Sequence, residues 1–297
     1  PFEALLKEAA RPGARPFTSY PFFIRDHQVS YAHSAGLLHE MRNTSYQAPR
    51  QWILAFAPAF QDAPDQEQSL ASRRRNLGRL VSNVKEVQSI KSLLRTRIFK
   101  GDDATRERFL ADAPYYSIIH LATHAKANDE EGEYSYLAFT EISDTLQNEL
   151  LYARDLYSMR LQAEMVVLSA CESGVGELRR GEGVISLARG FSYAGAKSLV
   201  TTLWRVSDRE SAALMELFYR HLKEGEPKDR ALREAKLQFI NQPGQGRAHP
   251  FFWAAFVLSG DMAPIVVEQS RFTVWVLVLL GVLFVFLLAR YTKRKPS

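Results

Sequence analysis

Short runs of apolar residues alternate along the chain with stretches in which apolar residues recur every three or four positions. The short runs, several of them followed by proline or glycine, are typical of buried strands, and the periodic stretches predict amphipathic helices. Strands and helices that alternate in this way predict an α/β domain of three layers, with a mostly parallel sheet covered by helices on both faces. The predicted strands are 52–58, 115–125, 165–171, 197–204 and 253–259, and the predicted helices are 77–94, 105–112, 183–194, 208–222 and 227–240.

Weaker patterns fill the rest of the body. Residues 21–31 predict a strand and 34–41 a helix, and a further strand and a short helix are predicted at 136–141 and 153–159. Residues 61–75 have no apolar periodicity and predict an exposed loop. No stretch of linker composition separates these elements, so we predict that residues 1–262 fold as one domain.

The C-terminal part of the chain has the pattern of a membrane anchor. After a linker at 263–271, residues 272–289 contain no charged residue, and four positive charges follow within 290–295. A helix of that length spans about 27 Å, close to the ~30 Å hydrocarbon core of a bilayer. We therefore predict one transmembrane helix and a short basic tail at 290–297, with a buried core helix as the alternative.

Positive flanking residues favour the cytoplasmic side of a membrane. We therefore expect the tail in the cytoplasm and the body on the other side. The opposite arrangement, a tail anchor with a cytoplasmic body, remains an alternative that breaks this rule.

The net positive charge of the chain comes from its C-terminal end. The formal net charge is +5, but residues 271–297 hold five of the 38 Lys and Arg residues and no acidic residue. The other 33 basic residues balance the 33 acidic residues, and a neutral body argues against nucleic-acid binding. The single cysteine excludes a disulfide framework and a cysteine-based zinc or iron–sulfur site.

Two residues capable of nucleophilic chemistry lie at the ends of predicted strands. His124 ends the first long apolar run, and Cys171 ends the second, 47 positions later. Because functional residues gather beyond the carboxyl ends of parallel strands, neighbouring strands would bring both side chains to one rim. A histidine within reach can convert a cysteine into a thiolate near neutral pH. The alternatives are an inert buried thiol and a structural histidine.

The backbone around these two residues can supply an oxyanion hole. The N–H groups of Cys171 and of Ala125, just after His124, are the candidate donors. Other chemistries have less support, because the turn after Cys171 has neither the serine elbow nor a phosphate-binding pattern. His120 and His124 would lie about 13 Å apart on a strand, too far for one metal ion.

The motifs around these residues resemble those of the CHAT family, caspase-like peptidase domains often found downstream of tetratricopeptide repeats. The resemblance runs from VSYAHSAGLL at 29–38 to WAAFVLSGD at 253–261. The most specific motifs, in chain order, are IIHLATHA, VVLSACESGVGE, GEGVISLARGFSYAGAKSLVTTLWRVSD and HPFFWAAFVLSGD.

This resemblance implies the caspase–separase fold and a cysteine endopeptidase, with Cys171 as nucleophile and His124 as general acid and base. Ala125 replaces a glycine of caspases, but the backbone donor is retained. Asp208 resembles an acid with which separases hold an arginine in the first substrate pocket, which implies cleavage after Arg or Lys. A simple helix cap is an equally open role for Asp208.

The resemblance also bears on partners and cofactors. It implies a protein or peptide substrate, no metal or organic cofactor, and a site that is ordered by upstream tetratricopeptide repeats or an activating partner. The alternative from another class is a catalytically silent scaffold that acts in signalling through protein–protein binding. An acyl transferase that uses the same thiolate is a third reading.

Overall fold

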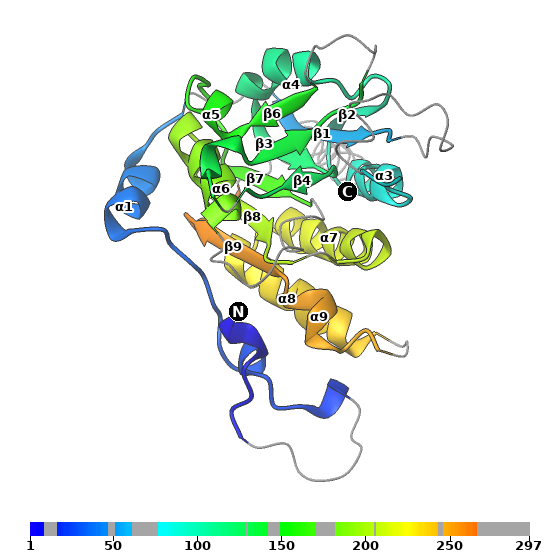
Figure 1. Ribbon diagram of the computed structural model, residues 1–297. Helices are drawn as coiled ribbons and strands as arrows, with labels where there is room; N and C mark the ends of the chain where they lie inside the picture. The colour runs from blue at the N-terminus through cyan, green and yellow to red at the C-terminus, as the bar shows by residue number, and fades with distance from the viewer. Residues whose placement is uncertain are drawn as a thin grey trace, which may run out of the picture. The chain divides into compact units, whose positions relative to one another are not determined.

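The five predicted strands of the central sheet are joined by a sixth, unpredicted strand (Figure 1). The strand order is β2-β1-β3-β7-β8-β9, and all neighbours are parallel except β9, which runs antiparallel to β8. The predicted mixed α/β fold with a mostly parallel sheet is therefore confirmed. The strands are β1 (Gln51–Pro58), β2 (Thr96–Gly101), β3 (Tyr116–Leu121), β7 (Met165–Leu168), β8 (Ser198–Thr202) and β9 (Phe256–Gly260).

The computed structural model describes most of the body of the chain, and Pro1–Ile265 form one compact unit. For residues 51 and 182–186 it describes the backbone alone. The described ranges are 1–8, 17–46, 51–60, 77–128, 130–141, 149–169, 182–204, 206–242 and 246–265.

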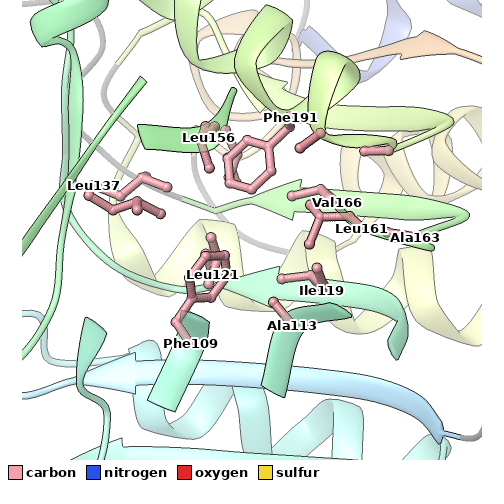
Figure 2. Packing of buried hydrophobic residues seen from close by; sticks show 14 of the residues in the cluster. Phe109, Ala113, Ile119, Leu121, Leu137, Leu156, Leu161, Ala163, Val166 and Phe191 are labelled. Atoms are coloured by element: carbon pink, nitrogen blue, oxygen red, sulfur yellow. The ribbon is translucent and has the colours of Figure 1, made fainter. Parts of the chain in front are cut away.

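One face of the sheet carries large apolar side chains. Leu54 and Phe56 of β1 belong to the same buried cluster as Ile119 and Leu121 of β3, because alternate residues of a strand share a face. Figure 2 shows Phe191 packed in this cluster. The helices that contribute to it are α4 (Arg106–Asp112), α5 (Ala153–Leu156) and α6 (Glu182–Ala194).

The opposite face is lined by small side chains where α3 (Asn83–Leu93) packs on β1. Ala55 and Ala57 of β1 and Ala122 after β3 pack against Val87 of α3. Small residues let α3 approach the sheet closely. The helices on this side are α3, α7 (Asp208–Lys223) and α8 (Lys228–Asn241), of which α7 contacts both α3 and α8.

A small antiparallel sheet branches from the end of β3. The apolar run predicted as one strand at 115–125 is divided, because Ala122–His124 leave the central sheet and Ala125–Lys126 (β4) enter the second one. Its other strands are β5 (Tyr136–Ala138) and β6 (Leu150–Tyr152), in the order β4-β5-β6. Two short 3-10 helices, η4 (Ala113–Tyr115) and η5 (Gly132–Tyr134), precede β3 and β5.

The strand predicted at 21–31 is wrong. The segment forms a 3-10 helix and two isolated bridges, in which Phe22 pairs with Leu6 and Tyr31 pairs with Ser259. Phe22 is buried with its ring 5.2 Å from that of Trp253, so this residue packs against a helix, and the segment meets the central sheet through the bridge of Tyr31. The N-terminal and closing helices are η1 (Phe2–Ala4), η2 (Phe17–Ser19), η3 (Phe23–Arg25), α1 (Ala35–Asn43) and α9 (Pro250–Trp253).

Some predicted features lie outside the described residues. They are the loop 61–75, the candidate nucleophile Cys171, most of the linker 263–271, the span 272–289 and the tail 290–297. Among the helices that the structure describes, none is both long and apolar enough to cross a membrane. The membrane anchor and the domain boundaries therefore stay predictions.

Candidate functional site

His124 is held where the two sheets separate. Just before it, the Ala122 N–H donates to Phe56 O of β1 (3.0 Å), and the Thr123 hydroxyl donates to Ala138 O of β5. His124 O itself accepts the Ala138 N–H at 2.9 Å. Contacts with both sheets therefore fix the backbone at this position, and the His124 side chain is 1% exposed.

The His124 ring has a defined orientation. Its Nε2 lies 2.6 Å from Gly78 O, and the ring meets Phe60 edge-on with 4.6 Å between centroids. A carbonyl oxygen can only accept a hydrogen bond, so Nε2 carries the proton. In the neutral ring, Nδ1 is then the nitrogen that can accept a proton, and this tautomer suits a general base.

The helix predicted at 77–94 begins only at Asn83, and the residues before it contact the candidate site. Residues 77–82 use their backbone groups for contacts with the site, because Gly78 O accepts from His124 and the Val81 N–H donates to Asp208 Oδ2 (3.1 Å). The apolar spacing of Leu77 and Leu80 therefore continued a helical pattern over residues that are not helical.

Asp208 is the first residue of α7, and Ser207 occupies the N-cap position. The prediction that Asp208 caps the helix is wrong by one residue, since its carboxylate bonds Val81 instead of the first turn of its own helix. Asp208 and His124 thus bind the same segment, 77–82, at two residues that are three positions apart. The structure brings these two predicted residues to one region.

Ala125, the predicted oxyanion donor, lies in β4 opposite Leu137. Because His124 and Ala138 form the hydrogen-bonded pair of this ladder, Ala125 and Leu137 form the next, non-hydrogen-bonded pair. Residues in such a pair direct their N–H groups away from the partner strand. The Ala125 N–H therefore points away from β5.

Cys171 lies outside the described residues, so the structure does not place its sulfur. The strand that leads to it, β7, pairs directly with β3 in parallel register, from Ile118 with Met165 to Leu121 with Leu168. The sequence analysis expects His124 and Cys171 at one rim of the sheet only if their strands are neighbours, and β3 and β7 are neighbours.

Asn83 is a supporting residue that the sequence analysis missed. Its Nδ2 donates to Pro58 O (2.9 Å) and Ala122 O (3.3 Å), which ties the first turn of α3 to the ends of β1 and β3. An Asn that follows Ser82 at the start of a helical pattern is a helix-start signal that could have located this end.

A second missed group lies one turn further along α3. Glu86 Oε1 is 2.9 Å from His120 Nε2, and His120 Nδ1 is 3.0 Å from Tyr219 Oη of α7. Burial and the nearby Glu86 carboxylate raise the pKa of Tyr219 well above its ordinary value of 10, so its hydroxyl stays protonated and donates to His120. His120 therefore links α3 and α7 to β3, and it is no metal partner of His124.

The fold and this region define a mixed α/β protein with an oriented histidine at the rim of a parallel sheet. The family model of the CHAT domain matches residues 1–261. The chain belongs to the CHAT domain family.

Two curated relatives are tetratricopeptide repeat protein 28 of Mus musculus and of Homo sapiens. They are 27% and 28% identical to the chain over an alignment of 215 residues, and the match covers 62% of this chain. The matched region is only 9% of the mouse protein and 8% of the human protein, so the chain corresponds to a small part of each.

Solved structures with some likeness include three proteins. The Arg specific cysteine proteinase gingipain R has 11% identity and a TM-score of 0.45, covering 72% of this chain and 47% of that one. Saccharomyces cerevisiae separase, in complex with securin, has 12% identity and a TM-score of 0.46, and the match covers 80% of this chain and 14% of that one. The Drosophila initiator caspase Dronc has 12% identity and a TM-score of 0.37, and the match covers 66% of this chain and 75% of that one. Likeness at this level establishes neither activity nor specificity for this chain.

Proposed function

We propose that this protein is a caspase-like cysteine endopeptidase in which Cys171 and His124 form the catalytic pair. The register of the central sheet carries the proposal. Residues paired across β3 and β7 differ by 47 positions, as in Leu121 with Leu168, and His124 and Cys171 also differ by 47. Each of the two chemically competent residues thus follows the last paired residue of its strand by three positions in the sequence, which supports their pairing.

In this mechanism, His124 Nδ1 removes the thiol proton, and the Cys171 thiolate attacks the scissile carbonyl carbon. The N–H groups of Ala125 and Cys171 bind the oxyanion that forms. The imidazolium then gives its proton to the leaving amine, and the C–N bond breaks to leave a thioester. Water, deprotonated by His124, hydrolyses the thioester and regenerates the thiol.

Asp208 supplies the specificity in this proposal. Its carboxylate is tied to the Val81 N–H through Oδ2, on the same segment that orients His124. A carboxylate near the base favours a cationic side chain at the first substrate position, so the enzyme cleaves after Arg or Lys.

Alkylation kinetics of the full chain test the catalytic pair. Cys171 is the only cysteine, so iodoacetamide incorporation reports its thiolate alone. We expect an apparent thiol pKa well below the ~8.5 of a free cysteine, and a shift back toward that value in His124→Gln. The control is His39→Gln, an exposed histidine on α1, which leaves the profile unchanged. Identical profiles for His124→Gln and the parent chain would overturn the pairing.

A peptide library then tests the reaction itself. We expect cleavage after Arg and Lys, loss of all cleavage in Cys171→Ala, and loss of the basic preference in Asp208→Asn. The library is also presented together with tetratricopeptide repeats, because the curated relatives are tetratricopeptide repeat proteins. A reactive thiolate without any cleavage would contradict the peptidase and favour the signalling scaffold.

The proposal includes attachment to a membrane through residues 272–289, with the body outside the cytoplasm. Its support is the uncharged length of this segment and the basic residues that follow it. A reporter that is active only in the cytoplasm, fused after Ser297, is expected to be active. A silent reporter would place the body in the cytoplasm instead.

A further inference from the structure

Three potential metal ligands gather at the C-terminal end of α7, away from the candidate peptidase site. His221 lies in the last turn of the helix, Glu224 is its C-cap residue, and Glu226 follows two positions later. His221 lies thirteen positions after Asp208 on the same helix, which is about 20 Å along its axis. The cluster therefore belongs to a different region of the molecule.

His221 is the unusual member of this cluster. Its side chain is only 9% exposed, yet neither ring nitrogen has a hydrogen-bond partner within the described residues. Glu226 Oε2 is buried and equally without a hydrogen-bond partner there. Buried polar atoms in folded proteins are nearly always satisfied, so these atoms point to a missing ligand.

The distances within the cluster fit metal ligands better than hydrogen bonds. His221 Nδ1 lies 3.5 Å from Glu226 Oε2 and 3.7 Å from Glu224 Oε2, and all three atoms lie within 4.8 Å of one another. A hydrogen bond between these groups would be about 2.7–3.2 Å long. Two ligands on a tetrahedral zinc ion are about 3.4 Å apart, given bond lengths of about 2.0–2.1 Å.

The backbone shapes the cluster and adds negative potential. Gly225, with φ of 82°, reverses the chain, and the Glu226 N–H returns to His221 O at 3.4 Å. The C-terminal end of a helix carries a partial negative charge, which favours a cation beside the two carboxylates. Arg230 Nε lies 3.8 Å from Glu226 Oε1, which leaves Oε2 for another partner.

We propose that His221 Nδ1, Glu224 and Glu226 bind one divalent transition-metal ion, with zinc as the preferred ion and water as the fourth ligand. One imidazole and two carboxylates suit zinc, whereas calcium takes six to eight oxygen ligands. Glu224 is 60% exposed, so it can move inward to complete the site. The ion ties the end of α7 to the turn that leads into α8. It takes no part in the proposed peptide cleavage.

Titration of the chelator-treated full chain with zinc chloride tests this site. The experiment uses a Cys171→Ala background, so that the candidate peptidase residues offer no thiolate to the metal. We expect one zinc ion bound per chain, with affinity at least tenfold weaker in Glu226→Gln. The control Glu216→Gln removes the same charge from an exposed pair with Arg220 on the same helix, and it leaves the affinity unchanged.

A spectroscopic readout separates ligation from general charge effects. Cobalt(II) in place of zinc is expected to give the strong visible absorption of a four-coordinate site, which Glu226→Gln abolishes and Glu216→Gln retains. His221→Gln is expected to abolish it too, although substitution of this buried residue also disturbs packing. Absence of stoichiometric zinc binding, or equal weakening by Glu226→Gln and Glu216→Gln, would overturn the proposal.

Discussion

At the scale of single residues, α8 carries two lysines, Lys228 and Lys236, whose side chains are buried in the interior. Lys228 is fully buried, and its Nζ donates to Asp261 O at 3.1 Å and lies 3.8 Å from Asp261 Oδ2. Burial lowers the pKa of Lys228 from its ordinary value of 10.5 to about 8, against the opposing effect of the Asp261 carboxylate. A charged amine in this position therefore costs free energy in the folded state.

This lowered pKa predicts a specific pH dependence. Between pH 8 and 10.5 the unfolded chain holds the Lys228 proton that the folded chain has lost, so the contribution of Lys228 to the free energy of unfolding rises with pH across this window. The rise is on the order of 3 kcal/mol, given 1.36 kcal/mol for each pKa unit. Lys228→Met should lack this part of the rise, and urea unfolding at several pH values measures it. Lys223→Met, at the end of α7, is the control, and a Lys228→Met profile parallel to the parent would contradict the assignment.

Sequence reasoning found some residues of the site and missed others for an identifiable reason. His124 was predicted because it ends an apolar run, which is a local signal. Glu86 and Asn83 bond to His120 and Ala122, which are 34 and 39 positions away in the sequence. The residues next to Glu86 and Asn83 in the sequence do not indicate these partners.

At the scale of elements, the ends of helices decide how closely neighbouring segments approach. Gly195, just after α6, has φ of 113°, and a β-carbon there would lie 2.4 Å from Leu161 O. Gly225, just after α7, has φ of 82°, but a β-carbon would meet nothing within 4 Å. Both glycines permit a backbone conformation that other residues rarely adopt, and only Gly195 is also closed in by backbone.

The two glycines form a matched pair for mutation. Gly225→Ala is expected to cost about 1 kcal/mol, the penalty of a positive φ for a residue with a β-carbon. Gly195→Ala should cost at least about 2 kcal/mol more, because the Leu161 carbonyl must move. Chemical denaturation of both variants measures the difference. Equal losses would mean that the segment around Leu161 yields easily.

Elements with strong apolar patterns were predicted well, and those defined by tertiary contacts were not. The central strands are buried on both faces, so their sequences are continuous apolar runs. β2 was missed because it is an edge strand in which Arg97 and Lys100 flank only two apolar residues. The periodicity of residues 77–82 predicts a helix because nothing in it reveals that Gly78 and Val81 bind distant side chains.

At the scale of the whole molecule, a buried ion pair links the N-terminal segment to α8. Glu3 and Lys236 are both buried, with 3.0 Å between Glu3 Oε1 and Lys236 Nζ, and Tyr31 donates to Glu3 Oε2 at 2.7 Å. Burial alone would raise the pKa of Glu3, but the Lys236 ammonium and the Tyr31 hydroxyl outweigh it and lower the pKa. Arg233 adds a hydrogen bond to Ile24 O at 2.8 Å.

Removal of one partner of this pair tests the fastening. Glu3→Gln leaves a buried ammonium without its carboxylate and is expected to lower the free energy of unfolding by about 3 kcal/mol. Asp26→Asn, which breaks the exposed pair with Lys7, should cost less than about 1 kcal/mol. The double variant Glu3→Gln/Lys236→Met should recover part of the loss. Urea unfolding measures all three, and a Glu3→Gln loss as small as that of Asp26→Asn would refute the coupling.

The distance in sequence between Glu3 and Lys236 has a practical consequence for anyone who shortens this chain. A fragment that starts at β1 keeps the six described strands of the central sheet and the helices α3 to α8. It nevertheless discards the counterion of an amine in the interior, 233 positions away. Poor yield of such a fragment would then reflect where it was cut, and it would say nothing about whether the central sheet and its covering helices can fold.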